Sequence, residues 1–226
     1  MRSTLPLEIE NLGYGFRDRT PAAVFSDESF SVGGDEFVSL IVKEPGAKTA
    51  FLNCVLGNYK PSFGRVHFWG FENRGYQRDQ IQQRVGWMIS KKEAHAPWIR
   101  LDEYLRALSR LYRTWNVGHC QNLVRILGLD FNRRMSDLSP DEAAKVSLVK
   151  ALSFEPELLV MDEVAANVSI ETLAAVREVL ARDFRRGKMS VLLISQSEEA
   201  ARFMSAGLPS RIVTFKSSPI QPSVQI

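Results

Sequence analysis

Cysteine and histidine are scarce in this sequence, which has two cysteines and three histidines among 226 residues. Cys54 and Cys120 lie far apart and fit no metal-ligand spacing, so we expect reduced thiols rather than a disulfide framework or a zinc module. No apolar run approaches the roughly 18 residues that a membrane-spanning helix needs, and no apolar stretch follows the N-terminus as in a signal peptide. The sequence therefore predicts a cytoplasmic protein that meets a membrane only through a partner.

An excess of charge of either sign is also missing. The chain has 29 lysines and arginines against 26 acids, a net charge of +3. So weak a balance gives no electrostatic footprint for nucleic acid, and we expect no such partner. Hydrophobic residues make up 45% of the chain, which excludes disorder and provides for a sizeable core. The length fits one large α/β domain or two small ones.

Strand and helix patterns alternate along the chain. Residues 37–42 and 158–161 are nearly continuous apolar runs, which is typical of strands that are covered on both faces. Further strands are predicted near residues 7–12, 23–32, 65–69, 85–89 and 190–194, and helices over 51–56, 141–152, 170–186 and 198–204. Such alternation predicts a mainly parallel sheet.

A change of pattern divides the chain. From residue 94 to 137 the apolar residues follow helical spacing only, which predicts an insert of about two helices. We expect residues 1–93 and 138–216 to form one α/β core around this insert. The last residues, 217–226, are rich in Ser and Pro and predict a loose tail.

The segment after the strand at 37–42 is close to a phosphate-binding loop. Lys48 and Thr49 open a helix, as in the pattern G-x-x-x-x-G-K-[ST], whose backbone N–H groups and lysine hold phosphates. That pattern needs glycine at positions 42 and 47, where this chain has Val42 and Ala47; Gly46 stands one place early. The alternative is a helix N-terminus that carries Lys-Thr without a ligand.

Two further residues of this loop oppose phosphate. Pro45 removes an N–H donor, and Glu44 places a negative charge beside a polyanion site. We therefore expect the backbone of residues 43–48 not to form a full anion-binding nest. The Lys48 ammonium should instead lie near Asp162 or Glu163.

These two acids end the apolar strand at 158–161. In phosphate-loop enzymes the first acid holds the Mg²⁺ shell and the second polarises the attacking water. The retained Lys48, Asp162 and Glu163 are therefore consistent with weak nucleotide or Mg²⁺ binding. They are equally consistent with an internal ion pair that needs no ligand.

Over nearly the whole chain, the order and spacing of these segments resemble the nucleotide-binding subunit of an ATP-binding cassette (ABC) transporter. The stretches at 52–57 and 60–66 resemble the family's helix and strand after the phosphate loop, and 152–163 resembles the stretch from the signature helix to the acids. The resemblance implies an α/β, P-loop NTPase-like ABC ATPase domain, with a mainly parallel core sheet, an antiparallel N-terminal β region and a helical insert. It also leads us to expect the strands at 37–42 and 158–161 to be neighbours in one sheet.

Carried over residue by residue, the resemblance implies a set of site positions. Phe16 falls where the family stacks an aromatic on adenine, Glu163 would be the catalytic base of an active enzyme, and Gln196 occupies the switch position. The other nucleotide-contacting positions are Gly46, Lys48, Thr49, Ala50, Ser90 and Asp162, with Thr49 and Asp162 as the Mg²⁺ ligands. The signature-like segment is Leu138, Ser139, Pro140, Asp141 and Glu142, in which Ser139 is also a helix N-cap.

The positions that depart from the family pattern are those that would contact the phosphates of a nucleotide. The signature Leu-Ser-Gly-Gly-Gln has lost both glycines and gained two acids, the switch histidine is Gln196, and Ser90 stands near the Q-loop glutamine position. The three histidines of the chain lie elsewhere, where we expect surface or packing roles. Segments that pack the fold are retained while those that would touch nucleotide have changed, so we expect ATP and Mg²⁺ to bind weakly or not at all.

Three functional hypotheses follow. The first is a degenerate, non-hydrolysing or weakly ATP-binding subunit, which dimerises with an ABC ATPase subunit, preferably a different one, and sits on a transmembrane permease at the inner face of the cell membrane. The second is a slow but genuine transport ATPase that uses Glu163. The third is a soluble regulator derived from such an ATPase. Trp98, Ile99, Tyr104 and Trp115 lie where the family receives the permease; their alternative role is to pack the helical insert.

Overall fold

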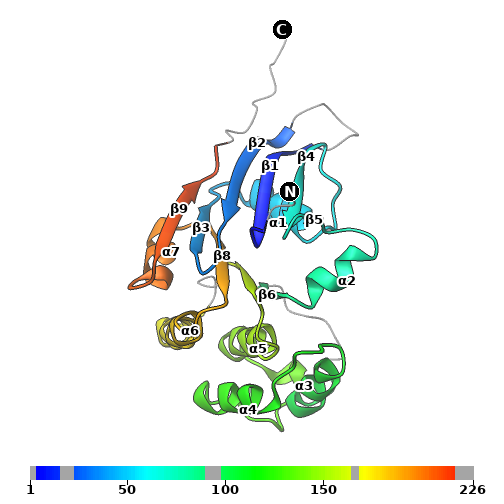
Figure 1. The fold of residues 1–226 in the computed structure, drawn as a ribbon. Coiled ribbons are helices and arrows are strands. Elements are labelled where there is room, and N and C mark those ends of the chain that lie inside the picture. Colours follow the sequence, from blue (N-terminus) through cyan, green and yellow to red (C-terminus); the bar gives the residue numbers. More distant parts are fainter. Residues whose placement is uncertain (1–3, 16–22, 90–97, 164–167, 217–226) are drawn as a thin grey trace.

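The computed structural model describes residues 4–15, 23–89, 98–163 and 168–216. Figure 1 shows a four-stranded sheet at one end of the molecule, a five-stranded sheet in the middle and helices α3 and α4 at the opposite end. Phe16, Ser90 and the tail at 217–226 lie outside the described residues. Among the described residues, no helix is long and apolar enough to cross a membrane.

The four-stranded sheet is the antiparallel N-terminal region that the sequence predicts. Its strands have the order β2-β1-β4-β5, and every neighbouring pair is antiparallel. Leu7 and Ile9 are buried on one face of the sheet because side chains alternate along a strand. The strands are β1 (Leu7–Gly15), β2 (Ala23–Val32), β4 (Phe63–Phe68) and β5 (Phe71–Glu72).

The five-stranded sheet is parallel, with the order β6-β7-β8-β3-β9. Its strands are β3 (Phe37–Ile41), β6 (Val85–Ile89), β7 (Leu158–Asp162), β8 (Ser190–Ser195) and β9 (Ser210–Thr214). The expectation that β3 and β7 are neighbours is wrong: both belong to this sheet, but β8 lies between them and pairs with each. A parallel crossover fixes the hand of a connection but not which open edge a later strand occupies, so the local pattern did not reveal this order.

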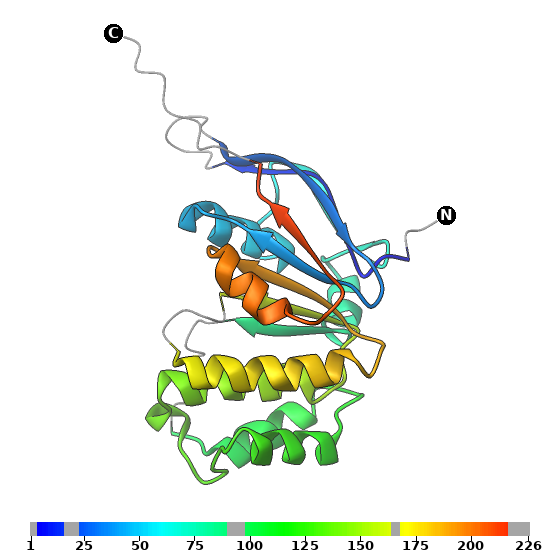
Figure 2. The ribbon, with the colours of Figure 1, turned by 90° about the vertical axis from the view of Figure 1, so that its left-hand side faces the viewer.

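Helices cover both faces of the parallel sheet. Figure 2 shows α5 and α6 as a layer against one face and α3 and α4 as a further layer beyond them. Helix α1 lies on the other side, toward the antiparallel sheet. The helices are α1 (Pro45–Val55), α2 (Gln77–Gln82), α3 (Leu101–Ser109), α4 (Val117–Ile126), the short 3₁₀ turn Met135–Asp137, α5 (Pro140–Leu152), α6 (Ile170–Phe184) and α7 (Glu198–Ser205). Helices α3 and α4 fall in the stretch where the sequence shows only helical spacing.

The two faces of β7 belong to two apolar clusters. Leu158 and Val160 pack with α1 and the buried face of the antiparallel sheet. Leu159 and Met161 pack with the helices of the opposite layer. The continuous apolar run of this strand is therefore explained by burial on both sides, as predicted. Both thiols, Cys54 and Cys120, are buried and free.

Candidate functional site

The segment that resembles a phosphate loop is helical from Pro45 onward. Glu44 is the N-cap residue, in an extended conformation without a side-chain cap, and its carbonyl accepts the first helical hydrogen bond from the Lys48 N–H at 2.9 Å. None of residues 43–48 has a positive φ. This geometry agrees with the expected lack of a full anion nest, because a nest requires residues in left-handed conformations and the motif glycines that permit them are missing.

The start of α1 and the end of β7 bring a cation and two acids together. The Lys48 ammonium lies 2.8 Å from Asp162 Oδ1 and 3.3 Å from Glu163 Oε2. The side chains of all three residues are only 12–13% exposed. The prediction that Lys48 lies near Asp162 or Glu163 is confirmed, and the lysine contacts both. We call Lys48, Asp162 and Glu163 the ion triad.

Further groups hold Glu163 in the ion triad. The Gln196 backbone N–H donates to Glu163 Oε2 at 2.8 Å, and Ser195 Oγ donates to Oε1 at 3.3 Å. Glu163 itself has a φ of +44°, and its N–H donates to the Ile194 carbonyl at 2.9 Å. A non-glycine residue adopts this left-handed conformation only when its surroundings hold it there. Sequence reasoning missed Ser195, although it is the last residue of β8 and precedes the switch position.

The switch-position residue also binds the phosphate-loop segment. The Gln196 side-chain amide donates from Nε2 to the Lys43 carbonyl at 3.1 Å. One residue therefore connects Glu163, through its main chain, with the start of α1, through its side chain.

The other positions that the sequence predicts to contact nucleotide make fewer contacts with the rest of the chain's candidate site. Thr49 is exposed, and its carbonyl accepts from the Asn53 amide at 2.8 Å, while Ala50 is buried in the core. Gly46 is exposed, and a methyl group added there would meet no atom within 4 Å. Packing of the chain therefore does not require the glycine at this position.

The signature-like segment serves as the start of helix α5. Ser139 is the N-cap: its Oγ accepts from the Glu142 N–H at 3.2 Å, and Glu142 Oε2 accepts from the Ser139 N–H at 2.8 Å. Pro140 occupies the first turn, and Leu138 is buried. This reciprocal capping box satisfies donors that a helix end otherwise leaves unpaired. The predicted N-cap role of Ser139 is confirmed.

Asp141 of the same segment reaches a second helix. Its Oδ1 accepts from the Ser169 N–H at 2.7 Å, and Ser169 is the N-cap of α6. This hydrogen bond from the Ser169 backbone lowers the pKa of Asp141 below its ordinary value. The acid that replaces a signature glycine thus connects the starts of α5 and α6, a contact that sequence reasoning did not predict.

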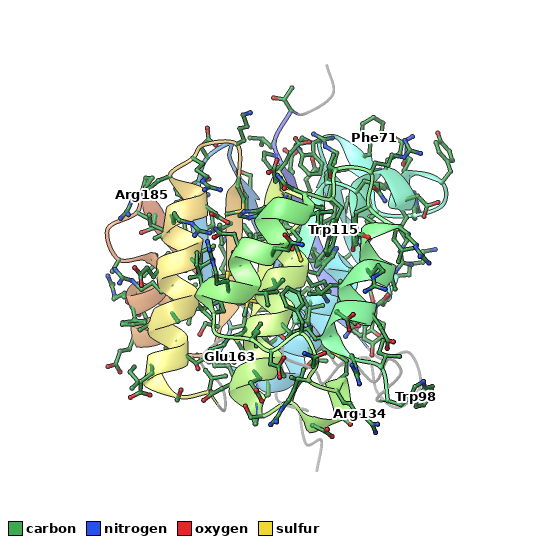
Figure 3. All side chains as sticks on the ribbon, turned by 90° about the horizontal axis from the view of Figure 1, so that it is seen from below. Phe71, Trp98, Trp115, Arg134, Glu163 and Arg185 are labelled. Atoms are coloured by element: carbon green, nitrogen blue, oxygen red, sulfur yellow. The ribbon has the colours of Figure 1, made fainter. Side chains whose placement is uncertain are left out.

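The aromatic residues expected at a permease surface fall into two groups. Tyr104 is buried, and Ile99 and Trp115 pack against the core of the helical layer. Trp98 is 72% exposed, and Figure 3 shows it projecting from the surface while Trp115 lies among the helices. The structure therefore supports the packing role for three of these residues and leaves Trp98 as the exposed one.

Comparison with known sequences identifies the family. A sequence model of the family described as "ABC transporter" matches residues 25–166, which is more than half of the chain. The chain therefore belongs to the ABC transporter family, in agreement with the resemblance and with the two-sheet fold.

Individual relatives agree with this assignment. The chain is 26% identical over 208 residues to the taurine import ATP-binding protein TauB of Pseudomonas savastanoi, which covers 89% of this chain and 77% of that protein. A solved ATP-binding subunit of an ABC transporter superposes with a TM-score of 0.78 at 20% identity, over 96% of this chain and 90% of the other. An ATP-binding cassette solved as a dimer with ADP and Pi superposes with a TM-score of 0.75 at 18% identity, over 92% and 94%. At these identities the solved structures establish the fold.

Proposed function

We propose that this chain is an ATP-binding-cassette subunit of a membrane transporter whose nucleotide site is held closed by its own residues. The observation that carries the proposal is the ion triad, in which Lys48 contacts Asp162 at 2.8 Å and Glu163 at 3.3 Å. Such a subunit binds Mg-ATP weakly, hydrolyses it little or not at all, and serves mainly as a structural partner.

Two features of the chain oppose nucleotide. Lys48 must leave two carboxylates to reach a phosphate, and a hydrogen bond to a charged group contributes about 1.5–3 kcal/mol. The start of α1 also offers a phosphate fewer donors than an intact phosphate loop, since Pro45 has no N–H and the Lys48 N–H is already bonded to the Glu44 carbonyl. ATP binding therefore has to supply the free energy that releases Lys48, and it gains fewer contacts in return.

The signature-like segment supports the same reading. In the family this segment meets nucleotide across a dimer, through glycines that allow close approach of the backbone. Here Ser139, Asp141 and Glu142 are engaged in hydrogen bonds within the chain. The segment thereby offers a mate's nucleotide an acidic surface, Pro140-Asp141, in place of glycine. We favour a heterodimer with an intact ABC ATPase subunit, in which the nucleotide bound by the mate meets this acidic segment and is hydrolysed less readily than opposite glycines.

The implied complex includes a permease at the inner face of the membrane. The exposed Trp98 belongs to the surface that would receive it. The relative TauB is named as an import protein, which favours uptake as the direction of transport. Hydrogen-exchange rates of the backbone amides of this chain, measured with and without its permease, would test whether Trp98 lies at the contact.

A slow ATPase is the second function that the site supports. Glu163 sits at the end of β7 beside Lys48, and Ser195 and the Gln196 N–H fix its carboxylate. A carboxylate fixed in this manner is suited to orient an attacking water once Lys48 has moved to a phosphate. Only a rate measurement separates this enzyme from the closed subunit.

The test combines binding and turnover on the purified chain. With millimolar Mg-ATP, a dissociation constant near 10 µM would add about 2.7 kcal/mol of stability, a shift of several degrees in Tm for a domain of this size. We expect a shift below about one degree and no saturable heat in calorimetry. The ATPase rate should equal that of a Glu163→Gln control. A shift of several degrees would refute the closed site, and a rate that disappears in the Glu163→Gln protein would establish the slow ATPase.

A further inference from the structure

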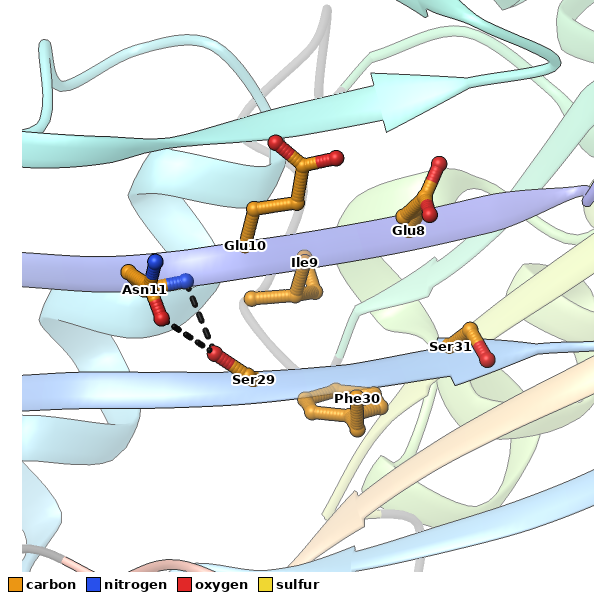
Figure 4. Close-up of a pocket in the computed structure, with 7 residues that line it drawn as sticks. All are labelled: Glu8, Ile9, Glu10, Asn11, Ser29, Phe30 and Ser31. Carbon is orange, nitrogen blue, oxygen red and sulfur yellow. Dashed lines mark hydrogen bonds between the residues drawn. The ribbon is translucent and has the colours of Figure 1, made fainter. Parts of the chain in front are cut away.

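The solvent face of the antiparallel sheet carries three side chains of types that bind metal ions. These residues are separate from the ion triad. Glu8 and Glu10 alternate on β1 and therefore share one face, and Glu8 pairs in register with His67 of β4. The flanking β4 residues Val66 and Phe68 are buried on the opposite face. Figure 4 shows both glutamates projecting from β1 on the side of the neighbouring strand β4.

These three side chains converge. One ligand atom from each of Glu8, Glu10 and His67 lies within 4.8 Å of the others. Glu8 and His67 are half-buried and Glu10 is exposed. Among the contacts of the described residues, no hydrogen bond or salt bridge engages these three side chains. Two neighbouring carboxylates repel one another, and a bound cation would relieve this repulsion.

The geometry suits a small transition-metal ion. Carboxylate and imidazole ligands bind Zn²⁺ at about 2.0–2.2 Å, which places tetrahedral ligand atoms about 3.3 Å apart. Closing from 4.8 Å requires only side-chain rotation, because the strand register already fixes the three backbones. Imidazole is a poor ligand for Mg²⁺ and Ca²⁺, which prefer oxygen, so the mixed set favours ions such as Zn²⁺.

A hollow between β1 and β2 adjoins the same glutamates. It has a volume of about 370 Å³ and is lined by Glu8, Ile9, Glu10, Asn11, Ser29, Phe30 and Ser31. Ser29 Oγ donates to Asn11 Oδ1 at 3.0 Å and accepts from the Asn11 N–H at 2.8 Å, which fixes this wall (Figure 4). The hollow gives solvent access to the two glutamates from the side of β2, and water completes the coordination shell where protein ligands number three.

We propose that Glu8, Glu10 and His67 form a surface site for a divalent transition-metal ion of the Zn²⁺ type. The ion joins β1 to β4 and is independent of the nucleotide site. Two neighbouring groups limit the ligand set. Arg65 pairs in register with Glu10 and adds a positive charge to the same face of the sheet, whereas Glu72, opposite His67 on β5, forms a salt bridge with Arg74.

Calorimetric titration of the purified chain with Zn²⁺ tests the site directly. We expect one saturable equivalent, and Co²⁺ should give the visible absorption of a low-coordinate complex. Loss of an outer-shell partner of a metal ligand lowers affinity about 10–100-fold, so His67→Asn and Glu8→Gln, which remove ligands, should each weaken Zn²⁺ binding at least tenfold. Binding should also weaken in acid, because protons compete for the ligands.

Matched variants keep the test decisive. Glu72→Gln alters a carboxylate of the same sheet outside the ligand set, and Glu171→Gln alters an exposed carboxylate of α6; both should retain Zn²⁺ affinity. Far-UV circular dichroism without metal confirms folding, and Glu10→Gln, at the exposed position, replaces either ligand variant that fails to fold. The proposal is overturned if Zn²⁺ shows no saturable binding, or if the ligand variants bind as tightly as the parent chain.

Discussion

Removal of the Lys48 ammonium is the sharpest test of the ion triad. In Lys48→Met the side chain keeps its approximate length and loses its charge. Asp162 and Glu163, at 12–13% exposure, then face each other without the cation that lies 2.8 and 3.3 Å away in the parent chain. We therefore expect this variant to be destabilised in the absence of any nucleotide.

The size of the effect follows from burial. Breaking a fully buried ion pair by removing one partner costs about 3–5 kcal/mol, because the remaining charge stays buried and unpaired. Here some solvent reaches the carboxylates, and Glu163 keeps the Gln196 N–H, so a loss of about 2–3 kcal/mol is expected. For a domain of this length that corresponds to a fall in Tm of about 5–10 °C.

Urea unfolding at 25 °C and thermal melting, both without nucleotide, measure this loss. Lys60→Met is the control, because Lys60 is exposed and should change stability by less than about 0.5 kcal/mol. Adding Asp162→Asn and Glu163→Gln to Lys48→Met should recover most of the stability. Replacing all the charged partners of a buried ion pair costs far less free energy than removing one partner and leaving the others charged. A Lys48→Met protein that melts within about one degree of the parent would refute the reasoning.

Two further predictions concern other contacts. Burial alone would raise the pKa of Asp183, but hydrogen bonds from His119 and Arg182 outweigh it and hold the pKa below its ordinary value of 3.8. The pKa of Asp183 is lower in the folded chain than in the unfolded one, so its carboxylate contributes stability at neutral pH that is lost as the pH falls below about 4. Urea unfolding should therefore show Asp183→Asn to be about 1–3 kcal/mol less stable than the parent at pH 7. At pH 3.5 the stabilities of variant and parent should lie closer together. Asp141→Ala removes the acceptor for the Ser169 N–H, so hydrogen exchange should accelerate at the Ser169 amide. The control is the Ala200 N–H at the start of α7, which donates to Ser197 and should exchange at the parent rate. Equal protection of the Ser169 amide in variant and parent would contradict a role for Asp141 in fixing α6.

Much of the fold was readable from the sequence where burial leaves a strong pattern. The strands Ala23–Val32 and Val85–Ile89 have the predicted bounds, because the first ends at the turn Gly33-Gly34-Asp35 and polar residues flank the second. Helix α2 was missed because its sequence, Gln-Arg-Asp-Gln-Ile-Gln, buries only Ile81 and so has no periodicity. Strand β9 was missed for a related reason: it lies at the edge of the sheet and none of its residues is fully buried.

The candidate site was predictable to the extent that topology fixes it. Parallel strands end at one edge of a sheet, so Lys48 could be expected to meet Asp162 or Glu163 even with the strand order wrong. The hydrogen bond between Asp141 and Ser169 was not predictable, because it depends on how two helices approach each other rather than on either local sequence. The same is true of Glu8, Glu10 and His67, whose proximity follows from the register of β1 against β4.

The position of β3 in the sheet has a consequence for how the chain folds during synthesis. Phe37 pairs with Val191 on one side and with Ser210 on the other, so this interior strand emerges long before either neighbour. Contacts of such high sequence separation close slowly, and an apolar strand with two open edges invites pairing with other chains meanwhile. Helix α1 and the antiparallel sheet, which are made from nearby segments, can cover one face of β3 early. Its edges stay open until the last strands arrive, so late-stage truncation or slow translation should lead to aggregation rather than to a partly folded soluble protein.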